Sequence, residues 1–333
     1  MIKRNIISAA IAAILLSGCS AGGASSNSSP ISSSESASTD NSTSTDNSSG
    51  EYVPGERDQN GVYVAEGYAA RLEYPLDEKS VNYAAKRFQY VYDEYLNGKS
   101  GNVFVTVVPD KNLFLAEKNG YPAMDYAKLV KLLTENMNFA EYIDIFPMLE
   151  LSDYYRTDTH WKQEKITDIA GFIAEKMGVR LSAEYTLEKL DKPFYGVHCR
   201  QADIDVEPDE LIYLKSAFMT DCTVFDGETN KLTDIYNLRL AEGDDPYEIF
   251  LSGAKSLMTI ENPNASGGRE LVIFRDSFAS SIAPLLAEGY SKITLIDIRY
   301  LAPELLGRFV DFGGSDVLFM YSAPVLNNSV TIK

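Results

Sequence analysis

The chain is poor in the side chains from which metal centres are usually built. Its 333 residues include three Cys, two His and one Trp. The sequence contains no CxxC pair and no His/Cys cluster with zinc-ligand spacing, which argues against a zinc site. It also lacks a P-loop, a dinucleotide-binding glycine fingerprint and an internal repeat. We therefore expect neither a metal nor a diffusible cofactor.

Positive charge is scarce as well. Lys and Arg number 30 against 48 Asp and Glu, which gives a formal net charge of −18. A protein that binds nucleic acid needs a basic face, so this balance argues against a nucleic-acid partner. An acidic surface favours solubility and says little about the fold.

The N-terminus has the features of an export signal. Lys3 and Arg4 precede a short apolar run from Ile6 to Leu16, which is too short for a stable membrane span. The residues that follow, Leu-Ser-Gly-Cys ending at Cys19, resemble the bacterial lipobox. That resemblance implies cleavage before Cys19 and a lipid on its side chain; the alternative is an ordinary signal peptide with a chance Cys. We expect a protein anchored by this lipid to the extracellular face of the bacterial cell membrane.

Three segments follow from composition. Residues 1–18 form the lipoprotein signal peptide, and residues 19–51, rich in Ser, Thr and Asn, form a disordered tether that cannot bury enough apolar surface to fold. Residues 52–333 form the globular domain, with an irregular or β-rich insertion or subdomain at 180–265. In an exported protein, Cys199 and Cys222 could pair or could remain free buried thiols.

Strands alternate with helices along the domain. The apolar patterns predict strands at 102–108, 143–150, 270–274, 292–298 and 316–322, and helices at 123–137, 161–178, 275–290 and 301–310. Such alternation indicates right-handed βαβ units, and hence an α/β fold with a mainly parallel central sheet covered on both faces.

Candidate catalytic residues fall where ligands gather in such sheets, at the carboxyl ends of the strands. The loop YYRTDTHW holds Asp158 and His160, and Ser277 follows a strand at the start of a helix. Arg299 and Tyr321 lie at the ends of the next two strands. A serine hydroxyl needs a base within hydrogen-bond reach, and the base needs an orienting carboxylate, so these residue types suit a hydrolase triad.

Each residue also has a simpler interpretation. An Asp-x-His tripeptide is common, and a Ser at a helix start is usually a cap. Trp161 could anchor a helix in the core or line a sugar site. We expect Ser280 and Ser281 to be packing residues, and His198 to have no catalytic role.

Four sequence blocks, taken together, resemble a known family. YYRTDTHW resembles the signature of the DHHW-motif family of bacterial exported proteins, although Thr159 departs from the Asp-His-His-Trp order at its second position. IFRDSFASSIAPLLAEGY followed by IDIRY is similar to the serine segment of the same family. VVPDKNLFL and DVLFMYS resemble its first-strand and last-strand motifs. The blocks occur in order over nearly all of residues 60–325.

That family resembles a branch of the SGNH hydrolase superfamily related to alginate O-acetyltransferases. The resemblance implies an SGNH-hydrolase-like three-layer α/β/α fold in circularly permuted order, with Ser277 as nucleophile, His160 as base and Asp158 as the orienting carboxylate. It also implies that Arg299 and Tyr321 line the site, although the spacing differs from that of the relatives. The alternatives are a salt bridge from Arg299 to Asp297 or Asp311, and core packing for Tyr321.

The expected function is therefore that of a cell-surface serine acyl-transfer enzyme. It would be an O-acetyltransferase or an acetylesterase acting on an envelope or secreted polysaccharide. Outside the cell there is no obvious acetyl-CoA supply, which favours either a membrane-bound O-acyltransferase that hands over acetyl groups or the acetylesterase function. The alternatives are a non-catalytic carbohydrate-binding lipoprotein, for which the 21 Tyr and 15 Phe would provide stacking surfaces, and a polysaccharide-assembly protein.

Overall fold

The computed structural model describes residues 60–333. The predictions for the signal segment 1–18, for Cys19 and for the tether 19–51 concern residues outside this part of the chain.

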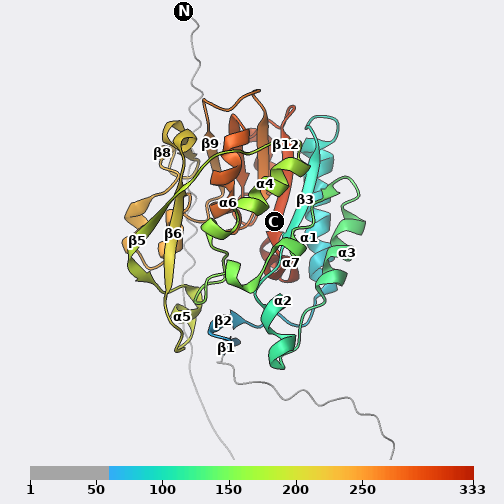
Figure 1. Cartoon of the computed structure of the whole chain (residues 1–333). Helices are drawn as coiled ribbons and strands as arrows, with labels where there is room; N and C mark the ends of the chain where they lie inside the picture. The colour runs from blue at the N-terminus through green and yellow to red at the C-terminus, as the bar shows by residue number, and fades with distance from the viewer. Residues whose placement is uncertain (1–59) are drawn as a thin grey trace, which may run out of the picture. The chain divides into compact units, whose positions relative to one another are not determined.

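An eight-stranded sheet forms the centre of the domain (Figure 1). Its first five strands are parallel and its last three are antiparallel to their neighbours. This confirms the predicted α/β class with a mainly parallel sheet. In spatial order the strands are β4 (Glu141–Tyr142), β3 (Val103–Val108), β12 (Asp316–Ser322), β10 (Glu270–Arg275), β11 (Lys292–Ile296), β9 (Leu257–Glu261), β7 (Thr223–Asp226) and β8 (Lys231–Thr233).

The middle strands are apolar on both sides because helices cover both faces of the sheet. All seven residues of β12 are buried, as are five of the six in β10. Within β10, Ile273 packs into one hydrophobic cluster and Phe274 into the other. This explains why the strands read as continuous apolar runs in the sequence.

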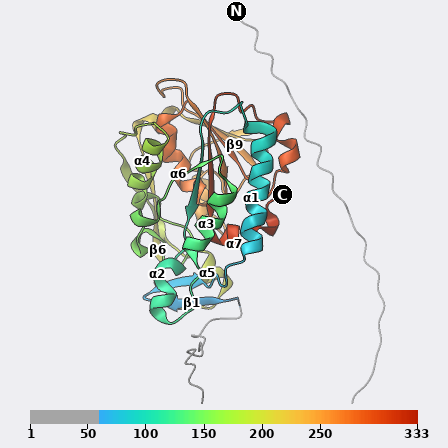
Figure 2. The ribbon, with the colours of Figure 1, turned by 90° about the vertical axis from the view of Figure 1, so that its right-hand side faces the viewer.

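Two helical layers flank the sheet (Figure 2). Helices α1, α3 and α7 cover one face, and α4 and α6 cover the other. The three-layer α/β/α arrangement is therefore present. The α-helices are α1 (Glu78–Val91), α2 (Asn112–Leu115), α3 (Tyr126–Asn136), α4 (Thr167–Lys176), α5 (Val197–Gln201), α6 (Ala279–Leu286) and α7 (Ala323–Asn327).

Short helices of other kinds complete the connections. A π-helical turn at Tyr92–Leu96 continues α1. The 3-10 helices span Glu117–Asn119, Phe146–Met148, Leu151–Asp153, Gln163–Lys165, Ala217–Asp221, Leu238–Glu242, Pro246–Ile249, Ala287–Gly289, Pro303–Arg308 and Ser329–Thr331.

Two sequence predictions were wrong in these connections. The strand predicted at 143–150 is not formed, because the chain turns into a 3-10 helix around Pro147, which has no N–H to donate to a sheet. Only the two residues of β4, just before this segment, pair with β3. The helix predicted at 301–310 is a 3-10 helix, Pro303–Arg308.

The segment 180–265 has two parts. Strands β5 (Thr186–Phe194) and β6 (Asp209–Lys215) form a separate antiparallel ribbon, with α5 in the connection between them. Strands β7, β8 and β9 instead extend the central sheet. The segment is thus β-rich, but it is only partly an insertion.

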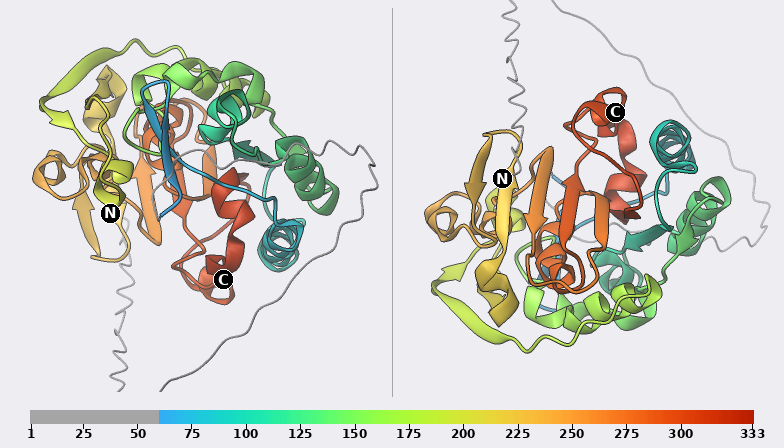
Figure 3. Two further views of the ribbon diagram at one scale, coloured as in Figure 1. Left: turned by 90° about the horizontal axis from the view of Figure 1, so that it is seen from below. Right: turned by 90° about the horizontal axis from the view of Figure 1, so that it is seen from above.

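A second ribbon, β1 (Val62–Ala65) and β2 (Tyr68–Arg71), crosses the carboxyl-end side of the sheet, as the view from below shows (Figure 3). The Ala69 amide donates to the Arg156 carbonyl at 2.8 Å, which fixes this ribbon against the Asp-His loop.

The structure also decides whether the two cysteines of the domain form a disulfide. Cys199 and Cys222 are both free thiols. In residues 60–333, none of the helices combines the length and the apolar character that crossing a bilayer would require.

Candidate active site

The Asp-His loop is a tight turn held by its own backbone. The Tyr155 amide donates to the His160 carbonyl at 3.1 Å, and the Lys162 amide donates to the Asp153 carbonyl at 2.7 Å. This antiparallel pairing forces residues 156–159 to reverse direction. Asp158 and His160 therefore lie on the same side of one short loop.

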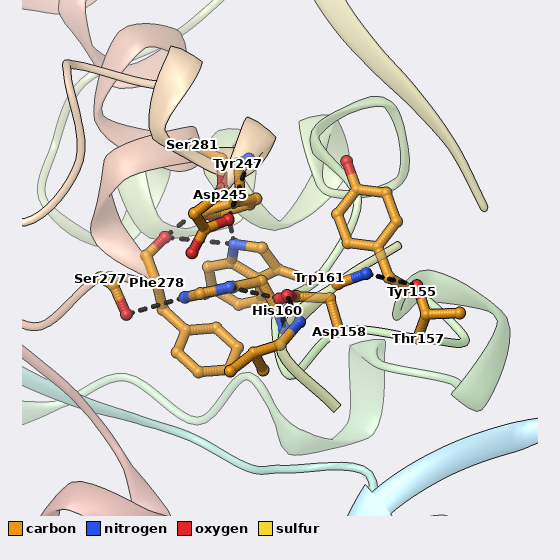
Figure 4. A network of polar contacts seen from close by, with 12 residues as sticks. Tyr155, Thr157, Asp158, His160, Trp161, Asp245, Tyr247, Ser277, Phe278 and Ser281 are labelled. Atoms are coloured by element: carbon orange, nitrogen blue, oxygen red, sulfur yellow. Dashed lines mark hydrogen bonds and ion pairs between the residues drawn. The ribbon is translucent and has the colours of Figure 1, made fainter. Parts of the chain in front are cut away.

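Ser277, His160 and Asp158 form a continuous hydrogen-bonded relay (Figure 4). His160 Nε2 lies 2.7 Å from Ser277 Oγ, and His160 Nδ1 lies 2.6 Å from Asp158 Oδ1. An ionised carboxylate can only accept, so Nδ1 carries the proton that faces Asp158. Nε2 is then free to accept the proton of the serine hydroxyl. The structure thus brings together side chains 117 residues apart in the sequence.

Asp158 is buried yet is held in its charged form. Burial by itself raises the pKa of this carboxyl, but the His160 ring and the amides of Val197 and His160 outweigh burial and hold the pKa well below its usual range. The Val197 amide donates to Oδ2 at 2.7 Å, and the His160 amide donates to Oδ1 at 3.0 Å. A permanent negative charge can therefore stabilise the imidazolium that forms when His160 takes a proton.

The turn that carries Ser277 is fixed by its neighbour Asp276. This carboxylate accepts from the Phe278 amide at 3.1 Å and from the Ser322 amide, at the end of β12, at 2.7 Å. Ser277 is half-buried between β10 and α6. Its own amide finds no acceptor within residues 60–333. A free N–H next to the nucleophile is the kind of donor that stabilises an oxyanion.

Trp161 packs in the core against the start of α6. The indole is fully buried, and Nε1 donates to the Phe278 carbonyl at 3.2 Å and to Ser281 Oγ at 2.9 Å. Of the two interpretations of Trp161, the core anchor is therefore confirmed and its candidacy as a residue that contacts substrate is wrong. Ser281 is more than a packing residue, because Tyr247 also donates to it, at 2.9 Å.

Tyr247 is a site residue that the sequence did not reveal. Its ring stacks on His160, with centroids 3.8 Å apart and planes 6° from parallel. This contact fixes the tilt of the imidazole. One Tyr among 21, in an irregular segment, carried no local signal for such a role.

The segment 180–265 also supplies backbone groups that pack against Asp158 and donate to it. Gly196 lies so near that a Cβ built on it would fall 2.2 Å from Asp158 Cβ. The next residue, Val197, gives its amide to the same carboxylate. On the other side of the loop, Asp209 of β6 accepts from the Thr157 amide at 2.8 Å and from the Thr157 hydroxyl at 2.7 Å. Sequence spacing gave no sign of these contacts.

Arg299 and Tyr321 lie apart from the nucleophile's cavity. Arg299 makes a bidentate salt bridge to Asp297, with Nε at 2.9 Å and Nη2 at 2.7 Å, which matches the structural alternative for this residue. Tyr321 is buried and stacks on Phe88 of α1 at 4.9 Å. Its hydroxyl has no hydrogen-bond partner in the described chain. The resemblance-based expectation that both residues line the site is not met.

A cavity of about 230 Å³ opens beside the serine. Six parts of the chain line it: Ala70, Arg71 and Glu73; Asp110–Asn112; Thr159; Val197, His198 and Gln201; Ser277 and Phe278 after β10; and Ser322, Pro324 and Val325 at the end of β12 and the start of α7. Across residues 60–333, His, Cys, Asp and Glu side chains do not gather in groups of three that could hold a metal ion.

Comparison with known proteins places the fold. No family model matches the chain, and no curated protein matches it. Among solved structures, a DHHW family protein from Eubacterium siraeum is similar, with TM-score 0.65 and 22% identity, over 83% of this chain and 96% of that chain. Bacillus cereus PatB1 with a sulfonyl adduct is also similar, with TM-score 0.62 and 16% identity, over 80% of this chain and 95% of that chain.

A weaker similarity links the chain to the O-acetyltransferase domain of Pseudomonas putida AlgJ, with TM-score 0.47 and 12% identity over 80% of this chain and 92% of that one. The two stronger matches confirm, at the level of the fold, the resemblance to the DHHW-motif family and the SGNH-like fold class.

Proposed function

We propose that the chain is a serine acyl-transfer enzyme, an O-acetyltransferase or acetylesterase that acts on an envelope or secreted polysaccharide. The observation that carries this proposal is the relay of Ser277, His160 and Asp158, with contacts of 2.7 and 2.6 Å beside an open cavity. Packing alone does not require a nucleophile, a base and an orienting carboxylate to align at the mouth of a cavity.

In the first half-reaction Ser277 Oγ attacks the acetyl carbonyl of a donor ester. His160 Nε2 takes the hydroxyl proton, and Asp158 stabilises the imidazolium. The free Ser277 amide donates to the oxyanion of the tetrahedral intermediate. When the intermediate collapses, the donor alcohol leaves with the proton from His160. The products are acetyl-Ser277 and the free alcohol.

In the second half-reaction an acceptor hydroxyl attacks acetyl-Ser277. His160 removes the acceptor's proton, the new ester bond forms, and His160 returns the proton to the departing Ser277 oxygen. If the acceptor is a sugar, the product is an O-acetylated glycan. If the acceptor is water, the product is acetate. The same residues serve both outcomes.

The proposal includes the place of action and a partner. A lipid on Cys19 would hold the protein at the extracellular face of the bacterial membrane. A membrane-bound O-acyltransferase in the same membrane would then supply the acetyl groups. The donor would reach Ser277 through the cavity at the carboxyl ends of the strands.

Hydrolysis of p-nitrophenyl acetate by the full-length chain tests the chemistry. We expect Ser277→Ala and His160→Ala to lower kcat/KM by about 10³-fold or more, and Asp158→Asn to lower it strongly but less completely. Ser152→Ala, which removes an exposed hydroxyl, is the matched control. A fluorophosphonate should label the wild type and not Ser277→Ala. Equal hydrolysis by the wild type and Ser277→Ala would remove the serine from the mechanism and favour a non-catalytic binding protein.

A further inference from the structure

Thr159 is the residue of the Asp-His loop that the acyl-transfer chemistry leaves unused. It lies between Asp158 and His160, and it lines the cavity beside Ser277. The other residues of the turn 156–160 all make hydrogen bonds, whereas the amide, the carbonyl and the hydroxyl of Thr159 have no partner within the described chain. Polar groups that a protein leaves unpaired at a cavity are available to a ligand.

A ligand in the cavity can reach this residue. Thr159 is partly exposed, and its hydroxyl oxygen is not fully enclosed by protein atoms. Asp110 Oδ2 and His198 Nδ1 on the same cavity differ in this respect, because they lack a partner in the described chain but are enclosed. Thr159 therefore offers the cavity an unpaired hydroxyl that remains open.

The loop holds Thr159 from both sides. Before it, the Thr157 amide and hydroxyl donate to Asp209 at 2.8 and 2.7 Å. After it, the His160 amide and ring are bound to Asp158 at 3.0 and 2.6 Å. Because both neighbouring positions are fixed, an acceptor that bonds to Thr159 meets a preformed site and does not have to order the loop.

Thr159 also lies close to the reacting atoms. It directly precedes His160, whose Nε2 lies 2.7 Å from Ser277 Oγ, and it shares a cavity of about 230 Å³ with that serine. This volume is several times the roughly 30 Å³ that one water occupies in the liquid. A molecule larger than water can therefore contact Thr159 with one polar group while another reaches His160 and the acyl group.

Charge on the cavity wall does not choose between neutral and acidic sugars. The lining includes the cationic side chains of Arg71 and Lys111 and the carboxyls of Glu73 and Asp110. The Arg71 side chain is 57% exposed, and the Nε atom of its guanidinium lies 3.8 Å from Glu73, so a positive group is available as well as negative ones. Hydroxyls are common to both kinds of sugar, and a threonine hydroxyl can both donate to them and accept from them.

We propose that Thr159 is the acceptor-binding residue and that it selects a sugar over water or a simple alcohol, through a hydrogen bond to a second hydroxyl of the sugar. This inference rests on the proposed acyl-transfer function. One hydroxyl of the sugar bonds to Thr159 while another attacks the carbonyl carbon of acetyl-Ser277. The new C–O bond forms as the bond to Ser277 Oγ breaks, and His160 carries the acceptor's proton to that oxygen. Thr159 thereby favours transfer over hydrolysis.

The ratio of acetylated acceptor to acetate, read by NMR on the full-length chain, measures this selection. The donor is p-nitrophenyl acetate. The acceptors are the methyl glycosides of glucose, galactose and mannose, with tetrahydropyranylmethanol as a ring analogue that has a single hydroxyl. We expect at least one glycoside to exceed the analogue by about 3- to 10-fold per hydroxyl, the effect of one added hydrogen bond. Thr159→Val should remove this advantage, and Thr159→Ser should keep it.

Matched variants separate recognition from a general disturbance of the loop. Val has the shape of Thr without the hydroxyl, so a disturbed loop would lower transfer to the glycosides and to the analogue alike. Thr223→Val makes the same change at an exposed position of β7, outside the cavity, and should behave like the wild type. Thr159→Ala takes the place of Thr159→Val if a thermal melt shows that the Val variant does not fold. A glycoside advantage that survives in Thr159→Val, an equal fall for both kinds of acceptor, or no glycoside advantage in the wild type would each overturn the proposal.

Nitrophenolate release separates this inference from the function on which it rests. Release without the glycoside advantage would leave the enzyme standing and remove the role of Thr159. Without release, ligand-observed NMR titration with the same glycosides decides. Binding that is roughly 3- to 10-fold weaker in Thr159→Val would then leave a sugar-binding site, and equal binding would remove the acceptor site as well.

Discussion

Tyr247 shows how a catalytic imidazole is held by a residue that takes no part in proton transfer. The centroid of its ring lies 3.8 Å from that of the His160 ring, and the two planes are nearly parallel. Its hydroxyl donates to Ser281 of α6. Base and nucleophile are therefore positioned through one aromatic side chain. A flat contact of this kind limits rotation of the imidazole about its side-chain bonds.

The stacking predicts a difference between two substitutions of Tyr247. Tyr247→Phe keeps the ring and loses one hydrogen bond, so kcat should fall by no more than about 3- to 10-fold. Tyr247→Leu loses the flat contact, and kcat for p-nitrophenyl acetate should fall by about 10- to 100-fold with little change in KM, because misplacing the base weakens the transition state. If the Leu variant turns over as fast as the Phe variant, the ring does not position His160.

Single residues differ in how far the sequence revealed them. Asp158, His160 and Ser277 were identified because their residue types suit a triad and because the blocks that carry them resemble the DHHW-motif family, whereas each pattern alone is common. For Trp161 the sequence left two interpretations open, a core anchor and a sugar-site residue, and only its hydrogen bonds to Phe278 and Ser281 decide for the core anchor.

At the scale of elements, the short helix α5 closes the site. It places the Val197 amide on Asp158 and His198 on the cavity wall. Such close approach requires Gly196 before the helix, since any Cβ there would overlap Asp158. The requirement for glycine is steric and not conformational, because a φ of −78° is accessible to any residue.

Gly196→Ala should displace α5 and release Asp158 from the Val197 amide. We expect a loss of stability of about 1–3 kcal/mol and at least a tenfold fall in kcat/KM, because the added methyl cannot fit without backbone movement. The control is Gly171→Ala inside α4, where a Cβ would meet nothing within 4 Å. That variant should gain about 0.5–1 kcal/mol from helix propensity. Urea unfolding and ester hydrolysis measure both quantities. Wild-type activity in Gly196→Ala would show that α5 does not orient the carboxylate.

The elements that the sequence predicted well are those buried on both faces. β3, β10, β11 and β12 are apolar over most of their length, and this pattern can be recognised without knowing which elements pack against them. The prediction at 143–150 failed because an apolar run is not enough for a strand when a proline removes a donor.

At the scale of the whole domain, stability should depend on pH through Glu73. Burial, with a contribution from Asp110, raises the pKa of Glu73 to about 7, above the roughly 4.3 of an unfolded chain. When folding raises the pKa of a carboxyl, the stability that this group contributes is fully present below its pKa in the unfolded chain. That contribution is lost as the pH rises through its pKa in the folded protein. Ionisation of Glu73 should therefore weaken the fold between about pH 4 and pH 7.

The Gln side chain cannot ionise, so the variant does not lose stability as the pH rises. The free energy of unfolding of Glu73→Gln minus that of the wild type should therefore be about 1–3 kcal/mol larger at pH 8 than at pH 4.5. Urea unfolding at the two pH values measures this. Glu117→Gln, on an exposed glutamate, controls for the loss of one negative charge. A stability difference between Glu73→Gln and wild type that stays constant across this range would contradict the assignment.

The proposed lipid anchor is also a property of the whole molecule. Cys19→Ser removes the thiol that would carry the lipid, so this variant should leave the membrane fraction on cell fractionation and appear in the medium or the soluble fraction. Blotting of the fractions, with the wild type alongside, measures this. A Cys19→Ser protein that remains in the membrane fraction would mean that another feature holds it there.

The sequence by itself determined the α/β class, the buried strands and the three residues of the relay. The class and the strands follow from local patterns of apolar residues. The relay residues follow from their side-chain chemistry together with the resemblance of the blocks that carry them to the DHHW-motif family. Only the tertiary structure decided which groups meet: Tyr247 on His160, Val197 on Asp158, and Arg299 on Asp297 and away from the cavity. Most such contacts join residues far apart in the chain. They depend on the register of the sheet and on how the layers pack, and neither can be derived from any single segment of the sequence.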